Sequence, residues 1–259
     1  DLHSFPTRRS SDLFVIMILT PEQWDVLGRM VSTHIAQRPT PQDAADAGLA
    51  DLGITGPKGP VTAVREILSG FVNARARYSS RRLDPRDEMP VRDITFWLEH
   101  RCTVERYDTD GIHIYSCDAV EVPHIVLAND HLHPRPMLDD GPDSVFDTLA
   151  SAMKLADAEA AVDIMHLIGS QGPKESGFVR DALEDRWSIV MRMREERGPE
   201  GFDAPTGQMT LGTSNMLYAI EDDGGPTVNP RGPASKISLV PVLGIQVWAA
   251  VSQWIWTGR

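Results

Sequence analysis

The most regular pattern of alternating hydrophobic and polar residues lies in residues 101–118. Aromatic and β-branched residues alternate with polar ones on both sides of Asp110 and Gly111, and Asp-Gly between two alternating runs is a strong signal for a β-hairpin. After Pro123, the continuously apolar run at residues 124–128 predicts a third, buried strand. We expect the rest of the chain to be organised around this sheet.

The position of the hairpin turn decides which residues of the two strands face each other. A two-residue turn at the Asp-Gly dipeptide, which the pattern favours, places Cys117 opposite Val104. A turn centred one residue earlier instead places Cys117 directly opposite Cys102, where the two sulfur atoms can bond or share a ligand.

Two helices are predicted before this sheet from their capping residues. Thr20, Pro21 and Gln23 have the pattern of a capping box with proline at the first helical position, and an apolar stripe follows them. The same Thr-Pro pair recurs at Thr40, so a second, short helix is expected there.

Further helices are predicted where apolar residues recur at helical spacing. We expect them over residues 64–72, 94–98, 143–156, 157–168 and 178–197. The arginine-rich residues 73–86 are interpreted as a solvated linker. Residues 200–207, rich in Pro and Gly, interrupt the pattern, and a second hairpin is predicted over residues 216–228.

The C-terminal residues 237–258 carry no charge and include three tryptophans. Their length is just sufficient to span a bilayer, but Pro241, Gly244 and several polar residues interrupt the apolar run. We therefore expect a buried strand followed by a core helix, and no membrane segment. The stretch from Ile237 to Trp256 is also a candidate surface for a protein partner or for a homo-oligomer.

These elements predict an α+β fold, with a largely antiparallel sheet, N-terminal helices and a central helical segment. A length of 259 residues, 41% of them hydrophobic, is sufficient for a hydrophobic core. We expect one domain over residues 17–259, with residues 200–207 as the best candidate for a sub-boundary. Residues 1–16 are expected to be a non-native tail, because residues 4–13 resemble the translation of a common sequencing-library adapter and so indicate an assembled environmental fragment.

Charge and cysteine content narrow the range of partners and compartments. A net charge of −12 argues against a nucleic-acid partner, because such binding relies on Lys and Arg that neutralise phosphates. Two cysteines form neither a disulfide framework nor a CxxC metal pair, which is typical of a reducing compartment. We therefore expect a soluble, cytoplasmic protein.

The densest cluster of candidate metal ligands follows the predicted third strand. In extended backbone His131 and His133 point to the same side and can bind one divalent ion such as zinc, with Asp139 as a further ligand and Asp130 as the base. The pair resembles the His-x-His that ends the first barrel strand in amidohydrolase-like and PHP-type metal hydrolases. The chain after it has too little β/α alternation to build their barrel, so we do not assign that family.

Two hypotheses for function follow. The first is a metal-dependent hydrolase, in which the ion held by His131 and His133 lowers the pKa of a bound water. The second is a non-catalytic interaction or assembly protein, whose Trp-rich C-terminus packs against a partner or a second copy. Sequence motifs of the commonest hydrolases, zinc proteases and nucleotide-binding enzymes are absent from the chain.

Overall fold

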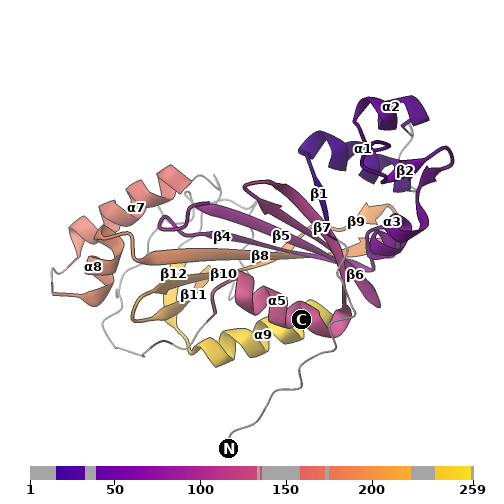
Figure 1. The fold of residues 1–259 in the computed structure, drawn as a ribbon. Helices are drawn as coiled ribbons and strands as arrows, with labels where there is room; N and C mark the ends of the chain where they lie inside the picture. Colours follow the sequence, from indigo (N-terminus) through magenta and orange to yellow (C-terminus); the bar gives the residue numbers. More distant parts are fainter. Residues whose placement is uncertain are drawn as a thin grey trace, which may run out of the picture.

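The computed structural model describes residues 16–32, 39–132, 135, 158–172, 175–222 and 237–257. Within these residues, ten strands form one antiparallel sheet, and helices pack on both of its faces (Figure 1). The predicted α+β class with a largely antiparallel sheet is therefore confirmed. The predicted helix over residues 143–156 and most of the proposed N-terminal tail lie outside the described residues.

The sheet consists of two halves with the same order of elements. The first half contains β4 (Ala76–Leu83), β5 (Val91–Leu98), β6 (Arg101–Asp108) and β7 (Gly111–Asp118), followed by the short 3-10 helix η1 (Ala119–Glu121) and helix α5 (Val122–Asn129). The second contains β8 (Trp187–Gly198), β10 (Thr206–Thr213), β11 (Leu217–Asp222) and β12 (Ile237–Pro241), followed by helix α9 (Gly244–Thr257). Strands β4 and β8 pair antiparallel and join the halves. Two short strands lie outside this pattern: β1 (Met17–Leu19) extends the sheet beyond β7, and β9 (Gly201–Phe202) pairs with the end of β8.

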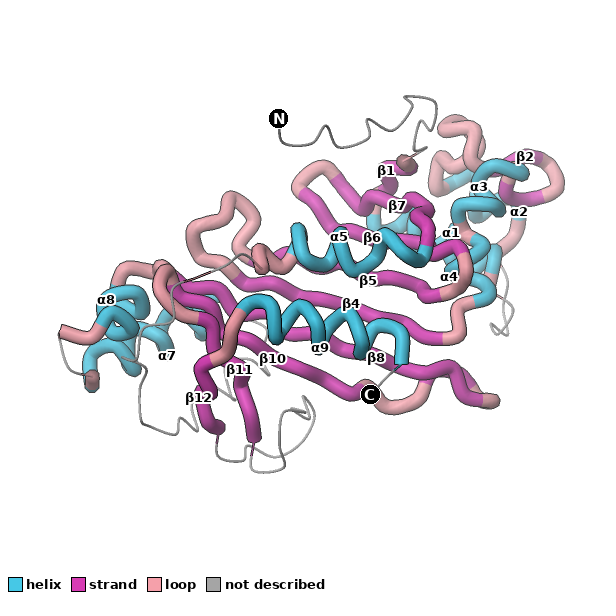
Figure 2. The backbone as a smooth tube through the Cα atoms, turned by 90° about the horizontal axis from the view of Figure 1, so that it is seen from below, coloured by secondary structure: helices cyan, strands magenta, loops and turns pink. Residues whose placement is uncertain are grey.

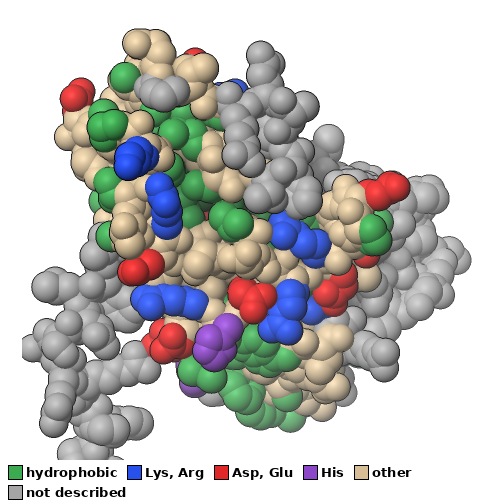
Figure 3. Space-filling view, turned by 90° about the vertical axis from the view of Figure 1, so that its right-hand side faces the viewer, with side chains coloured by type: hydrophobic (Ala, Val, Ile, Leu, Met, Phe, Trp, Pro, Cys, Tyr) green, Lys and Arg blue, Asp and Glu red, His purple; other side chains and the backbone are tan. Residues whose placement is uncertain are grey.

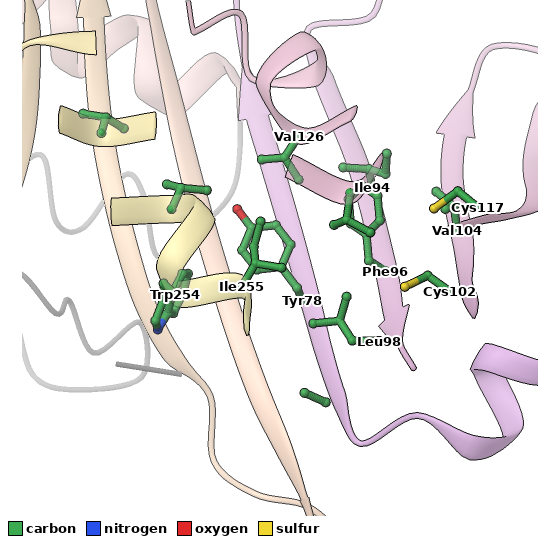
Figure 4. Packing of buried hydrophobic residues seen from close by; sticks show 14 of the residues in the cluster. Tyr78, Ile94, Phe96, Leu98, Cys102, Val104, Cys117, Val126, Trp254 and Ile255 are labelled. Carbon is green, nitrogen blue, oxygen red and sulfur yellow. The ribbon is translucent and has the colours of Figure 1, made fainter. Parts of the chain in front are cut away.

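Helices α5 and α9 lie side by side and cover one face of the sheet (Figure 2). Trp254 of α9 packs edge-on against Tyr78 of β4, with ring centroids 5.7 Å apart, in a cluster that also contains Phe96 (Figure 4). The predicted C-terminal strand and core helix are therefore confirmed, but the strand, β12, lies at the edge of the described sheet and its described side chains are not buried. No helix among the described residues is long and apolar enough to cross a membrane.

On the opposite face of the sheet, the helices of the described residues lie only at its two ends (Figure 1). One end packs against α1 (Pro21–Val31), α2 (Pro41–Asp46), α3 (Thr62–Ile67), α4 (Ser69–Asn73) and the small ribbon of β2 (Thr55–Gly56) and β3 (Gly59–Pro60). The other end packs against α7 (Ala158–Gln171) and α8 (Gly177–Leu183). The described helices thus leave the middle of this face uncovered.

Both predicted helix caps are confirmed. The hydroxyl of Thr20 accepts a hydrogen bond from the Gln23 amide at 3.2 Å, and the Gln23 side chain accepts one from the Thr20 amide at 3.0 Å. Thr40 and Asp43 make the same reciprocal pair at the start of α2. These contacts lie within four consecutive residues, so the local sequence is sufficient to specify them.

Three segments were predicted with the wrong secondary structure. Residues 178–197 form helix α8 and then strand β8 instead of one long helix, residues 94–98 belong to β5, and the supposed linker contains β4. The central strands β4 and β8 bury polar side chains, among them Arg82 and Arg192, on the face covered by α5 and α9. Because these positions are polar in sequence, the period-two alternation of a half-buried strand is hidden.

The predicted third strand is also wrong, because residues 124–128 belong to helix α5. Short apolar runs do not distinguish a buried strand from a buried helix, and Pro123 near the helix start favours the helix. The hairpin itself is confirmed, but Asp108 pairs with Gly111, so its turn is centred one residue earlier than the pattern favours. Cys102 therefore lies directly opposite Cys117. The first strand of the second predicted hairpin is β11, which pairs with β10 and β12. Its predicted second strand, residues 227–228, lies outside the described part.

Helix α4 packs so closely on β6 that it requires glycine at position 70. A Cβ atom on Gly70 would lie 2.3 Å from the backbone nitrogen of Thr103. We predict that Gly70→Ala lowers the free energy of unfolding by about 1–3 kcal/mol, the usual cost of overpacking. Urea denaturation measures the change. Gly56→Ala is the matched control, because its Cβ meets nothing within 4 Å, and an equal loss in both variants would contradict the prediction.

Candidate functional site

A hollow in the described surface lies on the face of the sheet whose middle the described helices leave uncovered. This open groove has a volume of about 650 Å³ and extends over β4, β5, β6 and β8. Aromatic, methionine and charged side chains dominate its lining. They include Trp24, Arg77, Arg81, Asp93, Trp97, Glu105, Tyr107, Met191, Met193 and Glu195.

The pleat of the central strands determines which side chains reach the groove. In β4, Arg77 and Arg81 face it, whereas Tyr78 faces α9 on the other side of the sheet. In β8, Met191 and Met193 face it, and both side chains are half-buried. The floor of the groove is therefore built from alternate residues of two strands that are more than 100 residues apart in the chain.

One carboxylate organises the end of the groove next to α1. Glu105 accepts hydrogen bonds from the indole nitrogen of Trp24 at 3.0 Å, from that of Trp97 at 3.3 Å, and from the hydroxyl of Tyr107 at 2.8 Å. Burial and the adjacent charge of Glu105 raise the pKa of Tyr107, which therefore keeps its proton as the donor. Three large aromatic side chains are thus fixed by a single buried acid.

The remaining charges of the groove form ion pairs with one another. Arg77 pairs with Glu195, which lies directly opposite it on β8. Arg81 makes two hydrogen bonds, of 2.6 and 2.7 Å, to Asp93, which lies directly opposite it on β5. Directly opposed charges of opposite sign stabilise a sheet modestly and hold each other in place. These guanidinium groups are consequently not available as an unpaired site for an anion.

A row of aromatic rings continues from the groove along the sheet. Trp24 and Trp97 both pack edge-on against Phe71, at centroid distances of 5.3 and 4.5 Å, and Trp97 also packs against Phe202 at 5.7 Å. The guanidinium of Arg77 lies 5.2 Å from the ring centroids of both Trp97 and Phe202. Such cation–π contacts restrain the rings at the rim of the groove.

Two of the predicted metal-site residues, Asp130 and His131, belong to the described part of the chain, and they have different surroundings. Asp130 ends helix α5 and is buried, whereas the next residue, His131, is exposed and has a positive φ of 50°. The two histidines therefore follow a helix, and the argument from an extended strand does not apply. His133 and Asp139 lie outside the described residues, so the metal site stays a prediction.

Asp130 is held in a buried network beneath α5. Its carboxylate accepts hydrogen bonds from Ser80 at 2.6 Å and from Arg192 at 2.7 Å, and the side chains of Asp130 and Arg192 are both fully buried. Nδ1 of His131 contacts the guanidinium of Arg82. The pKa of Arg82 is lowered by burial, although the adjacent Asp87 opposes this effect. Among the described residues, no three His, Cys, Asp or Glu side chains are grouped closely enough to hold a metal ion.

The sequence analysis missed the open groove because it assigned β4 and β8 to other structures. The sequence does carry a signal for strand β4, because Arg77, Ser79 and Arg81 alternate with its core positions.

On the side of the molecule that carries α3 and β9, basic and acidic side chains are interleaved and do not form a patch of one sign (Figure 3). No protein-family model matches this chain, and no curated protein sequence matches it significantly. Function is therefore argued from the geometry alone.

Removing one partner of the buried network should be costly. We predict that Asp130→Ala lowers the free energy of unfolding by about 3–5 kcal/mol, because Arg192 is left as an unpaired buried cation. Asp93→Ala removes a carboxylate from a partly exposed pair in the same sheet and should cost less than about 1 kcal/mol. Urea denaturation of both variants measures the difference, and equal losses would contradict a structural role for the buried pair.

Proposed function

We propose that this chain is a non-catalytic interaction protein that binds another protein in the open groove. The observation that carries the proposal is the sheet face that the described helices leave uncovered, with a hollow of about 650 Å³ and aromatic and methionine side chains between internal ion pairs. Aromatic residues, Met and Arg are enriched in protein interfaces. Anchoring residues of this kind contribute most of the binding free energy.

The lining fits an apolar polypeptide surface better than a small charged ligand. Met191 and Met193 are flexible and adapt to apolar side chains, whereas Trp97 and Tyr107 are held rigid by Glu105. Each arginine of the groove already has a carboxylate partner, so an anion would have to displace an internal ion pair. The partner we propose is a protein that presents apolar side chains to the groove floor and polar groups to its rim. A nucleic acid fits this lining poorly, as it does the overall charge of −12.

A second copy of this chain suits the groove less well than a different protein does. A symmetric dimer joins the same surface patch from both copies, and two concave grooves placed face to face leave a void between them. The net charge of −12 also makes two copies repel each other. We therefore propose a convex partner of different sequence.

The exposed side of α9 is the alternative interface. Val247, Val251 and Trp254 of this helix are buried on the sheet, but Ile245 is 66% exposed and Trp256 is 44% exposed. These two exposed apolar side chains support the alternative hypothesis that residues 237–256 contain an interface for a partner or for a second copy. Because α9 lies on the face opposite the groove, variants of the two surfaces separate the two proposals.

We predict that groove variants lose partner binding. Peptides that bind the folded wild-type chain are selected from a random peptide library, and their affinity is then measured by fluorescence anisotropy. Trp97→Ala and Met193→Glu should each weaken binding by at least about tenfold, because they remove an anchor or place a carboxylate beside Glu195. Ile245→Glu is the matched control on α9 and should leave affinity unchanged.

Several outcomes would contradict this prediction. They are a library that yields no binding peptide, peptides that bind the groove variants as tightly as the wild type, and loss of binding in Ile245→Glu alone. A wild-type dimer that Met193→Glu makes monomeric would assign the groove to self-association. Circular dichroism of every variant shows that the fold is intact, and Met193→Ala is the milder substitution if the glutamate variant does not fold.

The metal-dependent hydrolase hypothesis makes a different prediction. If His131 and His133 hold a divalent ion such as zinc, the purified chain should contain metal in near-stoichiometric amount, and His131→Ala with His133→Ala should remove it. Under the interaction proposal, elemental analysis gives the same low metal content for the wild type and the double variant.

We also propose that the protein functions in the cytoplasm, because both cysteines are free.

A further inference from the structure

Two cysteines face each other across the β6–β7 hairpin. Cys102 lies directly opposite Cys117 in the strand register, and both are free and buried. Directly opposed residues of antiparallel strands have Cα atoms about 4.5–5.5 Å apart, within the range of about 4.4–6.8 Å that a disulfide spans. Both sulfur atoms point to the side of the sheet that carries Val104 and Phe96 (Figure 4).

The two thiols have different chemical surroundings. The hydrogen bond from the Cys117 thiol stabilises the thiolate of Cys102, so the pKa of Cys102 is lowered and that of Cys117 is raised. The Cys102 thiol also donates a hydrogen bond to the carbonyl oxygen of Glu99 at 3.3 Å. Of the two thiols, Cys102 is the one whose ionisation is favoured by its partner, and a thiolate is the form of cysteine that reacts with oxidants.

The pair also lies where the hairpin can open. Cys102 follows the exposed Arg101 at the start of β6, and Cys117 precedes the exposed Asp118 at the end of β7. This end of the hairpin is the one remote from its turn. Strand ends open at a lower free-energy cost than a whole sheet, so a small oxidant can reach the sulfur atoms without global unfolding.

We propose that Cys102 and Cys117 form a reversible disulfide when the protein meets a peroxide. The Cys102 thiolate attacks one peroxide oxygen, the O–O bond breaks, and a sulfenic acid and a hydroxide ion result. Cys117 then attacks the sulfenic sulfur, the S–S bond forms, and the hydroxyl group leaves as water with the proton of the Cys117 thiol. Two thiols are oxidised in total, and one peroxide is reduced by two electrons.

The disulfide would fix the hairpin at its open end. It would close the chain between residues 102 and 117 into a covalent loop, which restricts the unfolded state. It would also tie together two strands, one of which carries Glu105 and Tyr107 in the open groove. The proposal does not depend on the groove binding a partner, because the chemistry involves only the two cysteines.

The test is oxidation of the full chain by hydrogen peroxide. After treatment and denaturation, thiols that react with Ellman's reagent should fall from two to none, and the peptide pair joined by the disulfide should weigh two hydrogen atoms less than its two separate peptides. Peptide mapping without reductant should join the segments that contain residues 102 and 117, and dithiothreitol should restore both thiols. The oxidised chain should also have a higher melting temperature than the reduced chain.

Single serine variants separate the roles of the two sulfur atoms. In Cys117→Ser, Cys102 should stop at a sulfenic acid that dimedone traps, whereas Cys117 in Cys102→Ser should react far more slowly. Three outcomes would overturn the proposal. They are crosslinked dimers in place of the internal disulfide, a gain of oxygen mass that peptide mapping locates on Cys102 or Cys117 of the wild-type chain, or two intact thiols at a peroxide dose that oxidises free cysteine completely.

Discussion

The buried ion pair between Arg192 and Asp130 is the contact on which the arrangement of the two halves depends. Arg192 belongs to the first strand of the second half, and Asp130 ends the helix that closes the first half. Both side chains are fully buried, and an unpaired charge at that depth costs several kcal/mol. Each half therefore supplies the partner that the other needs, and Ser80 and Thr210 add hydrogen bonds from the neighbouring strands.

This network also explains why the two faces of the sheet differ. On one face, α5 and α9 cover the central strands, and the buried charges must be satisfied inside the protein. On the other face, the described helices stand only at the ends, and the ion pairs of Arg77 and Arg81 are partly exposed. Partly exposed ion pairs contribute little to the free energy of folding, so stability alone does not explain these two pairs. Their effect is to neutralise the two arginines inside the groove, and Arg77 also restrains the rings of Trp97 and Phe202.

The register of the β6–β7 hairpin fixes which residues lie on each face of the sheet. Residues 102, 104 and 117 of the hairpin face α5, whereas Glu105 on the same strand faces the groove. A shift of one residue in the pairing would exchange these faces. The turn centred one residue before the Asp-Gly dipeptide decides the pairing of the thiols, because a turn on the dipeptide itself would place Cys117 opposite Val104 on the same face.

Local sequence by itself determined the elements whose contacts lie within a few residues. The capping boxes at Thr20 and Thr40, the existence of the β6–β7 hairpin and the C-terminal strand and helix are of this kind, because caps, turns and apolar runs are local signals. The tertiary structure decided the rest. Strands β4 and β8 are hard to recognise in sequence, since Arg82 and Arg192 occupy core positions, and the carboxylate that makes Arg192 tolerable there, Asp130, is 62 residues away. The open groove likewise needs Arg77 and Glu195 to meet across a strand pairing that spans more than 100 residues, and no short-range pattern encodes a contact between such distant residues.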